Sequence, residues 1–290
     1  MTMELRGKAA VVGIGETPHR RVWPGRTMWG LCAEAAAEAI QDAGLSREDI
    51  DGLMTFGHLI YPAAMAEYIG IQPRNFALGA GFQGSSSGAA LTVAAHVVTS
   101  GMAKYVMFVA GGARDPANPD ASIFMGPGAV QPGAPSEFVI PYGLAAGAGT
   151  PYGLIYTRHM HRYGTKQEQL AQMAVNQRFN AMKNPLAAFK DQPLTVEDVM
   201  NSRYVNYPLH LLESVMPVAG AIAFIVSSAE NAKTLKQPPA YLLGTGMCQM
   251  YANSWMNPDL LEVPSKYASK AAYAMSGYGP RDVQFANFYD

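Results

Sequence analysis

A glycine- and serine-rich turn between a predicted strand and a predicted helix is the feature of this sequence that points most directly to chemistry. Residues 74–101 read RNFALGAGFQGSSSGAALTVAAHVVTSG, and the start of the helix is expected to face a pocket. The turn holds Ser85, Ser86 and Ser87 but no cysteine. A serine needs a neighbouring base to attack a substrate, and His96 lies ten residues from Ser86, or about 15 Å along the helix. The serines are therefore predicted to cap the helix and line the pocket rather than to act as nucleophiles.

Histidine and cysteine residues elsewhere do not form a metal-binding pattern. His159 and His161 lie on an expected helix, where their side chains point to different faces, and no carboxylate or cysteine cluster accompanies them. Cys32 lies in an alanine-rich helix and is predicted to be a small buried side chain. Cys248 follows a predicted strand and is either structural or a thiol in the pocket. We expect neither a metal ion nor a separate cofactor.

Short apolar strands alternate with helices over the first 110 residues. Thr27 is a good N-cap for a helix over 27–43, and Gly44 is a good left-handed terminator. Because the strands are apolar nearly throughout, helices are expected on both of their faces. The pattern predicts a layered α/β fold with a mostly parallel sheet. Its strands are expected at 9–15, 51–57 and 104–112, with a further strand in the turn segment described above.

The middle of the chain contains a long segment, residues 112–153, with repeated proline and glycine and no sustained period. It is predicted to be an ordered lid, binding loop or interface arm, with disorder as the alternative. Beyond it, helices are predicted at 151–163, 167–182 and 265–275, with a short helix capped by Thr195, and strands at 218–227, 240–247 and 283–290.

Two α/β halves are expected, one over residues 1–238 and the beginning of another over residues 239–290. A half with only one or two strands cannot close its own core. The second half is therefore expected to be incomplete, with more chain needed after Asp290.

Composition and charge narrow the function classes. Only 15% of the residues are charged and 49% are apolar, so part of the surface is expected to be covered by another subunit, which favours an oligomer. The net charge of −1 predicts no nucleic-acid partner. The longest apolar runs are shorter than the ~20 residues of a membrane span. The N-terminus enters a strand without a targeting leader, which favours the cytoplasm.

Four segments, in this order along the chain, resemble thiolases of the sterol-carrier-protein-2 type, which include lipid-transfer proteins and acetyl-CoA acetyltransferases. The resemblance implies paired, similar α/β halves, an active site at their junction and a dimer across the N-terminal half. The family continues into a C-terminal portion that has no counterpart here. The segments are AAVVGIGETPHRR, SSSGAALTVAAHVVTSGMAKYVMFVAGG, RHMHRYGTKQEQLAQMAVNQRFNAMKNPLAAF and GAIAFIVSSAENAKTL.

Two departures from the family change the expected chemistry. The position of the family's nucleophilic cysteine falls at Gly84, or at Ser85 if the frame slides by one residue, so no thiol is present in either register. A motif resembling His-Asp-Cys-Phe is replaced by NFYD, which places Tyr289 where the family has a histidine. Acyl transfer through a covalent intermediate therefore loses its attacking atom and part of its oxyanion hole.

This combination resembles the thiolase-like aldolases of bacterial steroid side-chain breakdown, which cleave a β-hydroxyacyl-CoA together with an OB-fold partner of the DUF35 kind. By that resemblance Tyr289 exchanges a proton with the reacting atoms, Tyr251 is a weaker second candidate, and Tyr142 lines the pocket. Backbone N–H groups around Gly84 to Ser86 would bind the thioester carbonyl.

Two alternatives to the lyase remain open from the sequence. In the first alternative, the chain is a catalytically silent subunit that binds acyl-CoA or lipid. In the second, it is an acyltransferase that uses a serine or a thiol supplied by its partner. A charged loop at residues 19–21 either contacts the phosphates of CoA or is simply solvated.

Overall fold

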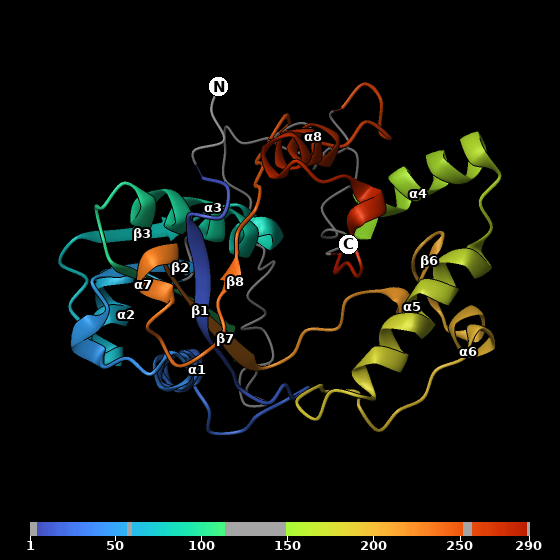
Figure 1. Ribbon diagram of the computed structural model, residues 1–290. Helices are drawn as coiled ribbons and strands as arrows, with labels where there is room; N and C mark the ends of the chain where they lie inside the picture. Colours follow the sequence, from blue (N-terminus) through green and yellow to red (C-terminus); the bar gives the residue numbers. More distant parts are fainter. Residues whose placement is uncertain (1–4, 57–59, 114–148, 252–256, 289–290) are drawn as a thin grey trace, which may run out of the picture.

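A six-stranded sheet forms the centre of the protein, for which the computed structural model describes residues 5–56, 60–113, 149–251 and 257–288. The strands are β1 (Ala9–Glu16), β2 (Gly52–Phe56), β3 (Phe76–Ala80), β4 (Tyr105–Gly112), β7 (Gly220–Ser228) and β8 (Ala240–Tyr241). Their order in the sheet is β3-β2-β4-β7-β1-β8 (Figure 1). Strands β1 to β4 share one direction, whereas β7 lies between β4 and β1 and is antiparallel to both.

Helices lie on both faces of this sheet, as the alternation of strands and helices predicts. The helices of the described residues are α1 (Met28–Ala43), α2 (Pro62–Ile69), α3 (Ser86–Thr99), α4 (Gly149–Tyr163), α5 (Gln167–Ala181), α6 (Val196–Asn201), α7 (Ala229–Ala232) and α8 (Ser265–Ser276). Residues of α1 and α2 belong to one core cluster, and residues of α3 belong to a second. Figure 1 shows α1 and α3 on opposite sides of the strands. The predicted α/β class is confirmed.

The side chains of β4 alternate between the two cores. Tyr105, Met107 and Val109 join the cluster that contains α1, while Val106 and Phe108 join the cluster that contains α3. Successive residues of a strand point to opposite faces, so a strand covered on both sides must be apolar at every position. This is why the central strands read as continuous apolar runs in the sequence.

Local signals and a close approach to β1 define helix α1. The Thr27 side chain accepts a hydrogen bond from the first turn, and Gly44 ends the helix with φ 72°, so both predicted boundaries are confirmed. A Cβ atom on Gly15 would overlap the carbonyl oxygen of Ala35, and one on Gly13 would also overlap the helix backbone. These two glycines allow the backbone of β1 to lie directly against α1.

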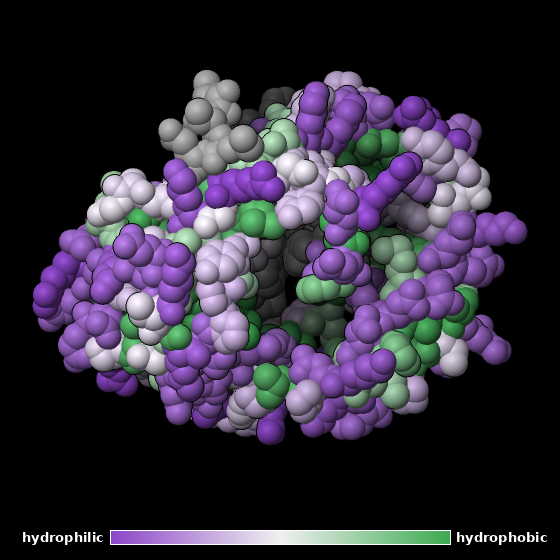
Figure 2. Space-filling view, viewed as in Figure 1, coloured by the Kyte–Doolittle hydropathy of each residue, from purple (hydrophilic) through white to green (hydrophobic). Residues whose placement is uncertain are grey.

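A helical segment between β4 and β7 lies beside the sheet (Figure 1). It contains α4, α5, α6 and a two-stranded sheet of β5 (Tyr204–Asn206) and β6 (Leu209–His210). The predicted cap of α6 is present, because the N–H of Asp198 donates to the Thr195 hydroxyl at 3.1 Å. Figure 2 shows that one face of the molecule is hollowed between the sheet and this segment. Most of the predicted loop at 112–153 lies outside the described residues.

The chain after β7 departs from the prediction at two strands. β8 contains only Ala240 and Tyr241 rather than the predicted 240–247. No described residue at 283–288 lies in a strand, and Phe285 and Phe288 are 88% and 81% exposed. An apolar run becomes a strand only where a neighbouring strand supplies hydrogen-bond partners. Helix α8 lies where the sequence predicts it, and the division of the chain at residue 239 stays a prediction.

Candidate functional site

The predicted strand–turn–helix unit is present, and Ser86 fixes its turn. One turn of 3-10 helix covers Gln83–Ser85, and α3 begins at Ser86. The Ser86 side chain is buried, and its Oγ accepts a hydrogen bond from the backbone N–H of Phe82 at 3.0 Å. Ser85 is the N-cap residue but makes no side-chain capping bond, contrary to the prediction, because Ser86 closes the turn from within. A hydroxyl so enclosed is poorly placed to attack a substrate.

The start of α3 is open to a ligand. Ser85 and Ser87 are exposed, and a Cβ atom built on Gly81 or Gly88 would meet no atom of the described residues within 4 Å. The first N–H groups of a helix have no partner within the helix, and its dipole adds partial positive charge there. The site lies just beyond the carboxyl end of β3, where open α/β sheets bind ligands. Its arrangement suits an oxygen atom that gains negative charge during a reaction.

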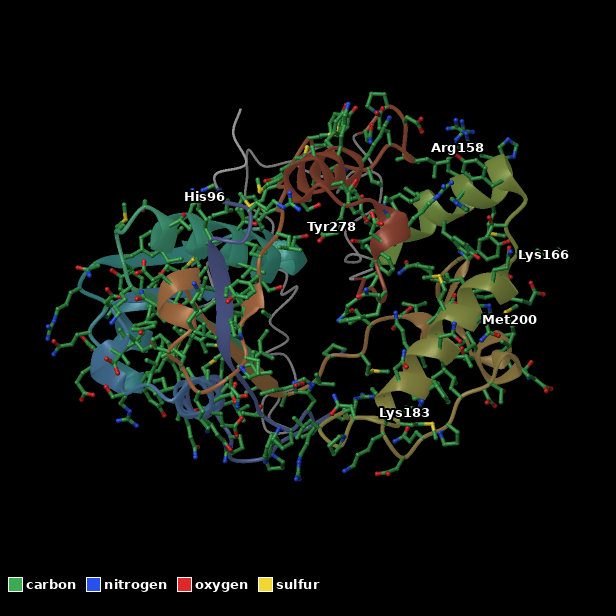
Figure 3. All side chains as sticks on the ribbon, viewed as in Figure 1. His96, Arg158, Lys166, Lys183, Met200 and Tyr278 are labelled. Carbon is green, nitrogen blue, oxygen red and sulfur yellow. The ribbon has the colours of Figure 1, made fainter. Side chains whose placement is uncertain are left out.

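Neither cysteine belongs to the turn or to the first residues of α3. Cys32 belongs to the core under α1, on the opposite face of the sheet, where burial raises the pKa of its thiol to about 12. Its predicted structural role is confirmed. Cys248 is exposed in the segment between β8 and α8. His96 is exposed in the last turn of α3, so it is separated from Ser86 by almost the whole helix (Figure 3).

The tyrosines singled out from the sequence are only partly described. Tyr251 is 38% exposed at the end of the segment that follows β8. This segment lies close to α8, because a Cβ atom on Gly246 would overlap the carbonyl oxygen of Ala268. Tyr142 and Tyr289 lie outside the described residues. Their roles, and those of Gly84 and Ser85, stay predictions.

A second cluster of titratable groups, which was not predicted from the sequence, lies between α6 and β7. His210 is 2% exposed, and its Nδ1 donates to the carbonyl oxygen of Ser202 at 2.7 Å, because a carbonyl can only accept. The backbone N–H of His210 donates to Glu213 Oε1 at 2.6 Å. Burial raises the pKa of Glu213, although its contacts with His210 oppose the shift. Burial and the Glu213 charge also raise the pKa of Tyr156.

This cluster has two buried polar atoms without a hydrogen-bond partner among the described residues, His210 Nε2 and Glu213 Oε2. The sequence signal that could have found it is the spacing of three residues between His210 and Glu213, which is typical of a capping box. The burial of the pair comes from residues far apart in sequence and has no such signal. The cluster lies outside the turn at α3 that carries the predicted chemistry.

Histidine pairs and acidic groups of the described ranges do not form a metal centre. His159 Nδ1 is 2.8 Å from the Thr165 hydroxyl, and its ring lies 4.7 Å from that of Tyr163. No group of three or more histidine, cysteine, aspartate or glutamate residues in the described ranges could hold a metal ion. Likewise, none of the helices in these ranges is long and apolar enough to cross a bilayer.

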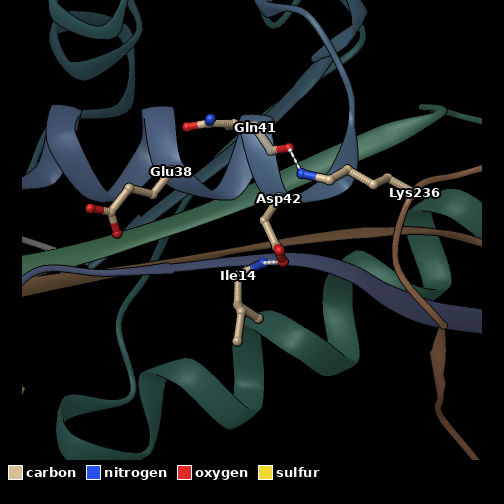
Figure 4. Close-up of a pocket in the computed structure, with 5 residues that line it drawn as sticks. All are labelled: Ile14, Glu38, Gln41, Asp42 and Lys236. Atoms are coloured by element: carbon tan, nitrogen blue, oxygen red, sulfur yellow. Dashed lines mark hydrogen bonds between the residues drawn. The ribbon is translucent and has the colours of Figure 1, made fainter. Parts of the chain in front are cut away.

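A polar depression of about 270 Å³ lies at the edge of β1 (Figure 4). Asp42 Oδ2 accepts a hydrogen bond from the N–H of Ile14 at 3.0 Å, and Lys236 Nζ donates to the carbonyl oxygen of Gln41 at 3.2 Å. Glu38 Oε2 similarly accepts a hydrogen bond from the backbone N–H of Glu16, two residues further along β1, at 3.1 Å. These carboxylates cover the free edge of β1 beyond the short β8, so the depression has a structural explanation.

The family of this chain is shown by individual relatives rather than by a family model. No family model matches the chain. It is 34% identical over 299 residues to the 17-hydroxy-3-oxo-4-pregnene-20-carboxyl-CoA lyase of Mycobacterium tuberculosis, covering 99% of this chain and 76% of the relative. It is 32% identical over 299 residues to the steroid side-chain-cleaving aldolase of Thermomonospora curvata, covering 99% of this chain and 75% of that protein.

Solved structures agree with these sequence relatives. The chain resembles the Ltp2-ChsH2(DUF35) aldolase with a TM-score of 0.83 and 32% identity, covering 96% of this chain and 72% of that one. It also shares the fold of a monomeric SCP2-thiolase-like protein of Mycobacterium smegmatis, with a TM-score of 0.75 and 22% identity, covering 98% of this chain and 59% of that one. The chain therefore belongs to the thiolase superfamily, in the sterol-carrier-protein-2-type branch that contains the steroid side-chain-cleaving aldolases.

Proposed function

We propose that this protein is a carbon–carbon lyase that cleaves a β-hydroxyacyl-CoA of the steroid side-chain type into a ketone and a shorter acyl-CoA. The observation that carries the proposal is the open start of α3, which keeps the helix N-terminus of a thiolase-type site but has no thiol beside it. The relatives named as a lyase and an aldolase support the same reaction class.

The proposed reaction needs no covalent intermediate. A base takes the proton of the β-hydroxyl group, the new carbonyl forms, and the bond between the α and β carbons breaks. The electron pair of that bond moves into the thioester as an enolate, which then takes a proton at the α carbon. Charge therefore develops on the thioester oxygen, and oriented N–H groups at a helix start are well suited to stabilise it.

We assign the thioester oxygen to the backbone N–H groups around Gly84, Ser85 and Ser86. The buried Ser86 hydroxyl holds the Phe82 N–H and so orders the turn without taking part in bond making. The first turn is exposed and no atom of the described residues lies within 4 Å of a Cβ built on Gly88, which supports placing the thioester group there. This division of roles requires no side chain of the turn to become acylated.

We further propose that Tyr289 exchanges the proton with the reacting oxygen or carbon, with Tyr251 as a weaker second candidate and Tyr142 as a lining residue. A phenol has a reference pKa near 10, so it donates a proton readily at neutral pH and needs neighbouring donors or positive charge to act as a base. A Tyr289→Phe variant is expected to lose most of its turnover while still binding the substrate. Cleavage at the parent rate in that variant would remove the assignment.

A DUF35 protein is the proposed partner, and a second copy of this chain is the proposed subunit. The likeness to the Ltp2-ChsH2(DUF35) aldolase supports the first proposal. The open edge of β3 supports the second, because Ala77, Leu78 and Gly79 are exposed and a strand edge can pair with its copy. A cytoplasmic location stays a prediction from the sequence.

The test is a product assay with the substrate for which the mycobacterial relative is named. The protein and a DUF35 partner are incubated with 17-hydroxy-3-oxo-4-pregnene-20-carboxyl-CoA, and the products are separated by liquid chromatography. Equal amounts of released ketone and shorter acyl-CoA are expected. Tight binding of the thioester without either product would contradict the lyase and identify a binding subunit instead.

A further inference from the structure

Phe82 is the large apolar residue of the turn at the start of α3. Every residue from Gly79 to Ala90 other than Phe82 and Gln83 is a glycine, an alanine or a serine. Phe82 is 39% exposed and belongs to neither of the two core clusters of the described residues. The packing of β3 and α3 into the core therefore does not explain why this position carries an aromatic ring.

The backbone of Phe82 is held on both sides. Its N–H donates to the buried Ser86 Oγ at 3.0 Å, and its carbonyl oxygen accepts a hydrogen bond from the N–H of Ser85 at 3.1 Å. The second bond closes a turn in which the Cα atoms of the first and last residues are about 7 Å apart or less. The Phe82 side chain therefore starts close to the N–H groups to which the thioester oxygen is assigned.

The surroundings of Phe82 leave it as the main apolar contact that this turn offers to a ligand. A Cβ atom built on Gly81 or Gly88 would meet no atom of the described residues within 4 Å. The next large apolar residue along the chain, Leu91, packs against the core cluster that contains α3. A phenylalanine side chain has only two rotatable bonds, so ordering it against a ligand costs little conformational freedom.

The position of the ring relative to the thioester oxygen indicates which part of a ligand it meets. When the thioester oxygen lies at the start of α3, the acyl group begins at the carbonyl carbon beside it. In a β-hydroxyacyl-CoA of the steroid side-chain type, the apolar rings begin only a few bonds further on. A ring fixed beside the helix start is therefore within reach of the acyl rings.

We propose that Phe82 is a specificity-determining residue, which contacts the apolar rings of the acyl group and favours a bulky cyclic acyl-CoA over one with a short acyl chain. Removing apolar surface from water favours binding in proportion to the area removed, and an acetyl group has little area to contribute. The inference rests on the proposed function, because that function places the thioester oxygen at the start of α3.

The test measures binding of a thioester that cannot be cleaved. The 17-deoxy form of 17-hydroxy-3-oxo-4-pregnene-20-carboxyl-CoA lacks the hydroxyl group that the cleavage needs, and acetyl-CoA offers the same CoA with a short acyl group. Phe82→Ala is expected to bind the steroid thioester about tenfold more weakly and to bind acetyl-CoA within about twofold of the parent. Phe82→Tyr, which keeps the aromatic ring, should retain most of the affinity for the steroid thioester.

Met102→Ala is the matched control, because it also truncates an exposed apolar side chain but lies beyond the far end of α3. This control is expected to match the parent for both thioesters. Thermal unfolding of each variant checks that the turn stays folded. Phe82→Leu provides a second reading if the alanine variant does not fold, and its affinity for the steroid thioester should lie between those of the parent and Phe82→Ala.

The inference is wrong if the parent does not bind the steroid thioester, if Phe82→Ala binds it as tightly as the parent, or if both thioesters weaken equally. If Phe82→Ala loses a DUF35 partner or a second copy of the chain while it keeps its affinity, the ring is a protein contact and the inference also fails. Selective weakening of the steroid thioester in a protein that releases no ketone would support the role of Phe82 and contradict the lyase. The two failures are therefore distinguishable.

Discussion

Replacing Ser86 by alanine separates two roles that a serine at the start of α3 could have. In the structure its buried Oγ accepts the N–H of Phe82 at 3.0 Å, so the substitution removes the acceptor from a partly buried donor. A donor left without a partner in such a position costs about 1–2 kcal/mol of unfolding free energy. The loss should be measurable as a lower urea midpoint with an unchanged dependence on denaturant concentration.

The same variant should remain an active lyase. Because the structure gives Ser86 a role in ordering the turn, cleavage is expected to slow by no more than about tenfold. Loss of a true nucleophile would lower the rate by about 10⁴-fold or more. Ser87→Ala is the matched control, since Ser87 is exposed on the same turn and should change the unfolding free energy by less than about 0.5 kcal/mol. A folded Ser86→Ala protein with turnover reduced by about 10⁴-fold would refute the structural role of this serine.

Three further predictions follow from the packing and the titratable groups. Gly15→Ala should destabilise the fold by about 3 kcal/mol or prevent folding, because its Cβ would overlap the Ala35 carbonyl. The control Gly88→Ala, whose Cβ would meet no atom of the described residues, should lower the unfolding free energy by less than about 1 kcal/mol in a thermal melt. A thiol reagent near neutral pH should label Cys248 and spare Cys32, whose pKa of about 12 keeps it protonated, and labelling of Cys32 in the native protein would contradict its burial. Burial raises the pKa of the Glu213 carboxyl from its ordinary value of 4.5 in the folded state, so the stability that it contributes is fully present below pH 4.5 and is lost as the pH rises through the raised pKa. Glu213→Gln should remove this pH-dependent loss of stability in urea titrations at several pH values. An unaltered pH profile of stability in the variant would contradict the prediction.

Features with a local cause were predictable from the sequence. Thr27 and Gly44 set the ends of α1, and Thr195 starts α6, because capping depends on a few neighbouring residues. The strand–turn–helix unit at Ser86 was predictable for the same reason. The role of the Ser86 hydroxyl was not, because the choice between Ser85 and Ser86 depends on how the turn is buried.

Features that depend on distant parts of the chain were not predictable. The insertion of β7 between β4 and β1 is set by packing across the sheet, and the sequence of β7 alone reads as any apolar strand. The apolar run at 283–288 reads as a strand but has no strand beside it among the described residues. The burial of His210 and Glu213 beside Tyr156 likewise depends on segments that are far apart in the sequence.

The central claim, cleavage without an acylated side chain, is tested most directly by intact-protein mass spectrometry during turnover. The protein and a DUF35 partner are mixed with 17-hydroxy-3-oxo-4-pregnene-20-carboxyl-CoA and quenched at short times, and the mass of this chain is compared with the products formed. Ketone and shorter acyl-CoA are expected to accumulate while the chain keeps its unmodified mass. An acyl adduct that forms and decays at the rate of turnover would contradict the claim.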